Sequence, residues 1–85
     1  MRFEVRTLAD AQALSRVLEH FALRTLLLDR VEATRDGDML NIILEIAGLD
    51  EPLAQMIVEK IRASVMVLEV VRSPQSEQYL DGVAL

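Results

Sequence analysis

The sequence predicts an α+β sandwich in which a four-stranded antiparallel sheet carries two helices on one face. Apolar residues recur with the period of a strand in four segments and with the period of a helix in two. The segments follow the order strand, helix, strand, strand, helix, strand. An Asp-Gly pair, typical of a tight hairpin, separates the two middle strands.

The first seven residues, MRFEVRT, alternate between apolar and charged side chains and predict a half-buried strand. Thr7 and Asp10 then have the spacing of a capping box, in which side chains bond the free N–H groups of a helix start. Apolar residues recur at helical spacing from Ala11 to Phe21. These signals predict a helix over residues 8–22.

Two further strands are predicted over residues 26–33 and 39–47, on either side of the Asp36-Gly37 turn. In the second of them, every alternate residue from Leu40 to Ile46 is apolar. Its opposite face is only partly apolar. This pattern suits a sheet with helices on one side and a partner over part of the other.

Asp50 begins a second helix as its N-cap, and Pro52 is tolerated in the first turn. A last strand follows over residues 65–71, with Met66, Leu68 and Val70 on one face and Val65 and Val67 on the face away from the helices. Residues 1–72 therefore form one domain, followed by a polar tail over residues 73–85. With right-handed crossovers, this order gives a ferredoxin-like βαββαβ arrangement.

Composition excludes several kinds of partner and chemistry. The formal net charge is −5, the basic residues do not cluster along the chain, and the aromatic residues are only Phe3, Phe21 and Tyr79. Such a chain is poorly suited to bind nucleic acid. Cysteine is absent, which excludes disulfides and thiol chemistry. No apolar run is long enough to span a membrane and no signal-peptide pattern is present, so a cytoplasmic protein is expected.

No residue pattern indicates catalysis. His20 is the only histidine, and it falls on the polar face of the first predicted helix, where a solvated side chain is expected. Asp36 and Asp38 flank the hairpin glycine but lack the further ligands of a calcium loop. No serine follows a nucleophile-elbow pattern. We therefore expect no catalytic residue, no metal site and no cofactor.

Apolar residues make up 52% of the chain, which is high for 85 residues with a small interior. Part of this apolar surface is expected in a subunit interface. A two-fold homodimer that buries strand edges or the open face of the sheet would also remove edges that invite aggregation.

Residues 13–17, ALSRV, followed by Phe21 and by the predicted strand order, resemble an ACT domain over residues 1–72. The similarity is greatest to the small regulatory subunit of acetolactate synthase. The resemblance implies an amino-acid ligand held between two subunits, a homodimer and a partner enzyme that the module regulates. The implied ligand-binding residues are Asp10, Ala11, Gln12 and Ala13 from one subunit, with Leu27 and Asp29 from the other.

The chain departs from that family at the implied site. Gln12 stands where the family has a glycine, and Ala9 and Leu27 stand where valine-binding members carry polar amides. Two functions therefore stay open. One is a non-catalytic regulatory module that binds an amino-acid-like metabolite or regulates an enzyme such as acetolactate synthase. The other is a ligand-free interaction or oligomerisation module, in which Asp10 is only a capping residue.

Overall fold

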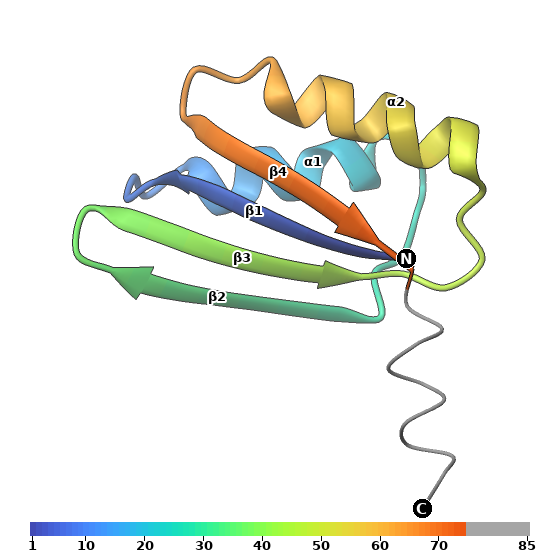
Figure 1. Ribbon diagram of the computed structural model, residues 1–85, viewed down its shortest axis with the longest axis horizontal. Coiled ribbons are helices and arrows are strands. Elements are labelled where there is room, and N and C mark those ends of the chain that lie inside the picture. Colours follow the sequence, from blue (N-terminus) through green and yellow to red (C-terminus); the bar gives the residue numbers. More distant parts are fainter. Residues whose placement is uncertain (75–85) are drawn as a thin grey trace, which may run out of the picture.

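The computed structural model describes residues 1–74. It has the predicted order of elements, as Figure 1 shows. The elements are β1 (Arg2–Leu8), α1 (Ala13–Ala22), β2 (Arg30–Asp36), β3 (Met39–Glu45), α2 (Glu51–Arg62) and β4 (Val67–Ser73). The strands form one antiparallel sheet in the order β2-β3-β1-β4. The predicted ferredoxin-like α+β fold is therefore confirmed.

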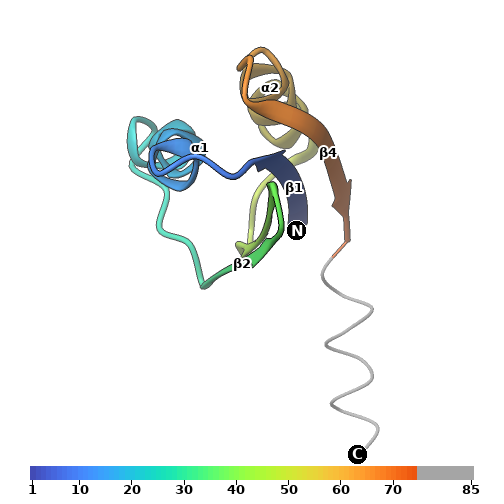
Figure 2. The same ribbon diagram turned by 90° about the vertical axis from the view of Figure 1, so that its left-hand side faces the viewer.

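Both helices lie on the same side of the sheet, and the core fills the space between the two layers (Figure 2). Alternate residues of β1 and β3 point into this core, because side chains along a strand point to opposite faces. The ring of Phe3 on β1 meets that of Phe21 on α1 edge to face, with 5.3 Å between centroids. The fully buried side chains include Phe3, Val5, Thr7, Ile42, Leu44, Ile57 and Ile61.

The start of the first helix differs from the prediction. β1 runs through Leu8, and α1 begins at Ala13 rather than at residue 8. Thr7 cannot serve in a capping box, because its side chain is buried in the sheet and its Oγ1 donates to the carbonyl of Leu8 at 2.8 Å. At the second helix the prediction is confirmed, since Asp50 Oδ1 accepts a hydrogen bond from the backbone N–H of Leu53 at 3.0 Å.

The second strand begins four residues later than predicted, at Arg30 rather than residue 26. The chain leaves α1 through Thr25, whose φ is 54°, and the N–H of Leu26 bonds back to the carbonyl of Phe21. This closing turn consumes residues that the apolar pattern assigned to a strand. The hairpin itself is confirmed, because Gly37 has a φ of 62° at the turn between β2 and β3.

The last strand also differs in the direction of its side chains. A bulge lies between the pairs Arg6–Glu69 and Thr7–Val67, so Leu68 is an extra residue that shifts the alternation. Val67 therefore packs against the core on the helix side, contrary to the prediction. Val65 precedes the strand and is 93% exposed. In the predicted polar tail, residues 75–85 lie outside the described part of the chain.

Candidate functional site

The loop between β1 and α1 contains four of the predicted ligand residues. Asp10 Oδ1 accepts a hydrogen bond from the backbone N–H of Gln12 at 2.8 Å, and its carbonyl accepts one from the N–H of Ala13 at 3.0 Å. Asp10, Ala11 and Gln12 are exposed, whereas Ala13 is buried in the core. Asp10 thus closes the turn before α1, whose N-cap position has no side-chain cap, and the side chain of Ala13 packs in the core beneath this turn.

Gln12 occupies the N-cap position of α1 with an ordinary backbone conformation, φ −94° and ψ −7°. The loop therefore requires no glycine at this position. The side chain of Gln12 accepts a hydrogen bond from the guanidinium of Arg16, one turn along the helix, at 3.0 Å. Gln12 therefore places a side chain over the first turn, on a backbone conformation that needs no glycine.

Leu27 and Asp29 lie in the segment that joins α1 to β2. The N–H of Asp29 donates to the carbonyl of Glu45 at 2.8 Å, and its Oδ2 accepts a hydrogen bond from the N–H of Ala47 at 2.8 Å. Asp29 thereby fixes the start of β2 to the end of β3. Leu27 is 87% exposed, so its side chain is free to contact another molecule.

Within one protomer these two groups of residues are far apart. The loop after β1 lies at the end of the sheet where Leu8 pairs with Met39, whereas β2 starts at the other end, where Arg30 pairs with Glu45 (Figure 1). A single copy of the chain therefore does not bring the six predicted ligand residues together. A shared site requires residues from a second copy.

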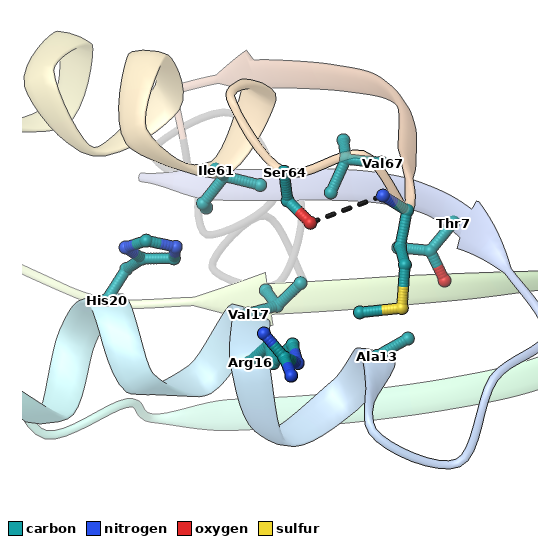
Figure 3. Close-up of a pocket in the computed structure, with 9 residues that line it drawn as sticks. Thr7, Ala13, Arg16, Val17, His20, Ile61, Ser64 and Val67 are labelled. Atoms are coloured by element: carbon teal, nitrogen blue, oxygen red, sulfur yellow. Dashed lines mark hydrogen bonds between the residues drawn. The ribbon is translucent and has the colours of Figure 1, made fainter.

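A small cavity of about 10 Å³ lies between the two helices and the ends of β1 and β4 (Figure 3). This volume accommodates about one water molecule. The hydroxyl of Ser64 accepts a hydrogen bond from the N–H of Met66 at 3.3 Å beside it. The lining residues are Thr7, Ala13, Arg16, Val17, His20, Ile61, Ser64, Met66 and Val67.

His20 is partly buried at this cavity rather than fully solvated as the sequence predicted. Burial lowers the pKa of His20 below its ordinary value, and the charges of Arg24 and Lys60 lower it further, while Glu19 acts in the opposite direction. Sequence reasoning missed this environment, because Lys60 lies forty residues away along the chain and only the tertiary fold brings it near.

The face of the sheet opposite the helices carries ion pairs between neighbouring strands. Glu45 lies between Arg2 at 3.5 Å and Arg30 at 3.4 Å, and Arg6 lies 3.7 Å from Glu69. A shallow groove of about 130 Å³ crosses this face. It is lined by Glu4, Val5, Arg6, Asn41, Ile42, Ile43, Glu69 and Val71. The predicted apolar surface on this face is therefore interrupted by paired charges.

Within residues 1–74, no three His, Asp or Glu side chains gather in a way that could hold a metal ion. In the same part of the chain, neither helix is long and apolar enough to cross a membrane.

The structure is similar to solved ACT domains. The ACT domain from GTP pyrophosphokinase of Chlorobium tepidum gives a TM-score of 0.73 for its crystal structure, with 10% identity, 85% of this chain covered and 94% of that one. Its solution structure gives 0.74, with 9% identity and coverage of 87% and 84%. The C-terminal domain of MgtC from Mycobacterium tuberculosis gives 0.58, with 19% identity and 82% of each chain covered. At these identities, the likeness shows the fold.

Comparison with curated protein sequences gave no match. The family model described as an ACT-like domain matches residues 1–79, which is nearly the whole chain. The protein therefore belongs to the ACT-like domain family, whose domains are regulatory small-molecule-binding modules.

Proposed function

We propose that this chain is a non-catalytic regulatory module that acts as a homodimer and binds a metabolite of the amino-acid class between its two copies. The observation that carries the proposal is the state of β2. All seven residues of β2 are exposed, and within residues 1–74 the strand pairs only with β3. A free strand edge of this kind is a ready surface for a second copy of the same strand.

Antiparallel pairing of two β2 strands about a two-fold axis would complete the predicted site. The start of β2, next to Leu27 and Asp29, would then lie beside the end of β2 in the other protomer. That end is tied to the loop after β1, because the N–H of Ala9 donates to the carbonyl of Asp38 at 2.9 Å. Leu27 and Asp29 of one copy would thus approach Asp10, Ala11 and Gln12 of the other.

The groups at this position suit an amino acid. The exposed carboxylate of Asp10 attracts an ammonium group. The positive end of the α1 dipole attracts a carboxylate. Leu27, which is 87% exposed, offers apolar contact to a side chain of the ligand. A metabolite bound across the two copies would stabilise the dimer. The ligand-bound dimer would then change the activity of a partner enzyme such as acetolactate synthase.

A melting screen with the free amino acids, each at millimolar concentration, tests the ligand class. Because binding to the folded state alone raises stability, we expect one or a few amino acids to raise the Tm by several degrees. A dimer whose Tm moves with none of them would contradict ligand binding. Co-purification with the catalytic subunit of acetolactate synthase, and a change in that subunit's activity, would test the partner.

A second candidate is a ligand-free interaction module, which three observations favour. The carboxylate of Asp10 already bonds the helix start, and the Gln12 side chain lies over the first turn. Ala9 and Leu27 also lack polar atoms in their side chains that could hold a ligand. This candidate predicts a stable dimer with no response to amino acids, together with binding to a partner protein.

A further inference from the structure

The basic residues of the chain fall into two groups by their partners. One group makes ion pairs with carboxylates and consists of Arg2, Arg6, Arg30, Arg62 and Arg72. The other group has no carboxylate within ion-pair distance among residues 1–74. It consists of Arg16, Arg24, Arg35 and Lys60. Arg16 and Arg24 bond only to an amide oxygen and a backbone carbonyl, at Gln12 and His20.

One member of the second group, Arg16, lines the crevice between the helices together with His20, and the guanidinium of Arg24 lies beside them, where it donates to the carbonyl of His20 at 2.6 Å. Arg16, His20 and Arg24 follow one another at intervals of four residues, which places them on one stripe of α1 and just past its end. Lys60 lies in the last turn of α2, and its charge contributes to lowering the pKa of His20. Figure 3 shows Arg16 and His20 on α1, with the ring of His20 lying between the two helices. Glu19 is the one acidic group that acts on His20.

The crevice is shallow and has apolar residues close to its basic groups. Its cavity of about 10 Å³ is too small for a metabolite. Leu23, next to Arg24, is 72% exposed, and Met56, one turn before Lys60, is 39% exposed. An extended chain laid over this surface could place carboxylates on the basic side chains and apolar side chains on Leu23 and Met56.

We propose that the surface formed by Arg16, His20, Arg24 and Lys60 docks an acidic segment of a partner protein. Charge complementarity selects this occupant, because guanidinium and ammonium groups without carboxylate partners gather here on a chain whose net charge is −5. The surface belongs to the helix layer, so it stays open when two β2 edges pair. The inference extends the partner-binding part of the proposed function and does not depend on amino-acid binding.

Fluorescence anisotropy with a labelled ten-residue peptide of alternating Glu and Leu tests the proposal on the full chain at low salt. We expect saturable binding that weakens with added salt and becomes about tenfold weaker in the double variant Arg24→Gln/Lys60→Gln. The matched control Arg6→Gln/Arg35→Gln removes the same charge from the open sheet face and the hairpin, and should bind as the wild type does. Equal losses in the two double variants, or no binding to wild type, would overturn the proposal.

The single variant Lys60→Gln should fold as the wild type does, because the Lys60 side chain makes no hydrogen bond or ion pair within residues 1–74. We expect it to weaken binding by about threefold. His20 gives an independent readout, since it is the only histidine and its ring protons titrate alone in the NMR spectrum. Bound carboxylates should raise its pKa, and a titration curve unmoved by saturating peptide would contradict docking here. If the protein binds the peptide but no free amino acid changes its Tm, the docking surface is supported and the proposed amino-acid site is contradicted.

Discussion

The carboxylate of Asp10 lies 2.8 Å from the backbone nitrogen of Gln12 and closes the turn that leads into α1. In the proposed dimer, this position faces the space between the two copies. A ligand carboxylate that approaches the helix start must therefore share it with a residue of the same charge. The stronger the hydrogen bond between Asp10 and the N–H of Gln12, the weaker the expected affinity of the site for a ligand carboxylate.

Asp10→Ala should lower the free energy of unfolding by about 1 kcal/mol, because the backbone N–H of Gln12 loses its acceptor in the turn before α1. Gln12→Gly should change it by less than about 0.5 kcal/mol, because glycine is accepted at an N-cap. The helix predicted over residues 8–22 placed Gln12 inside the helix, where glycine would cost up to about 1 kcal/mol. Urea unfolding of the two variants distinguishes these positions, and a larger loss for Gln12→Gly than for Asp10→Ala would contradict a helix that begins after Gln12.

The triple variant Ala9→Asn/Gln12→Gly/Leu27→Asn should bind valine, leucine or isoleucine, which the wild type should bind poorly. The two amides supply polar partners, and the glycine removes a side chain from the helix start. Calorimetry on both proteins measures the difference. Strong valine binding by the wild type would show that the site is understood wrongly, and a folded triple variant without binding would count against the resemblance in this loop.

Thr25→Gly should stabilise the fold by about 1 kcal/mol. Thr25 has a φ of 54°, in the left-handed region that a β-branched residue enters at a cost and glycine enters freely. Thr25→Ala is the matched control, because it also loses the bond from Oγ1 to the carbonyl of Arg24 but keeps a Cβ at the same φ. Thermal unfolding should rank glycine above alanine, and the reverse order would argue against strain at this turn.

Acid should destabilise the protein through His20. Its pKa in the folded state is lowered by burial, Arg24 and Lys60, so the unfolded chain binds a proton more readily. The contribution of neutral His20 is complete above its ordinary pKa of 6.5 and is lost as the pH falls through the lower folded value. Unfolding of wild type and His20→Gln between pH 8 and pH 5 should give a smaller pH dependence for the variant. Identical profiles would mean that His20 contributes nothing to the pH dependence of the free energy of unfolding.

The fold was predictable from local patterns. The exact start of β2 and the face to which the side chains of β4 point were not. Alternation in β1, the cap at Asp50 and the turn at Gly37 each depend on a few neighbouring residues, and all three are confirmed. The turn at Thr25 closes through the bond from the N–H of Leu26 to the carbonyl of Phe21, and the bulge at Leu68 shifts the pairing of β4 with β1. As a result, β2 starts at Arg30 rather than residue 26, and the side chain of Val67 packs against the core. No glycine or proline marks the turn or the bulge in the sequence.

The candidate site was predictable only in part. The resemblance located the loop after β1, and the structure adds what each residue does there, such as the bond from Gln12 to Arg16. Periodicity gave the stripe of α1 that holds His20 but not the approach of Lys60 from α2. Contacts between elements distant in sequence leave no pattern in a single chain.

Pairing of two β2 strands is tested most directly by cysteine cross-linking, because the chain has no cysteine of its own. Single variants Glu32→Cys, Ala33→Cys and Thr34→Cys place a thiol at or beside the middle of β2. Directly opposed residues of an antiparallel pair lie about 4.5–5.5 Å apart between Cα atoms, within the range that a disulfide spans. Under mild oxidation, we expect at least one of the three to form a disulfide-linked dimer, and Val71→Cys on β4 to stay unlinked. Cross-linking through Val71→Cys with none through β2 would contradict a site shared across that edge.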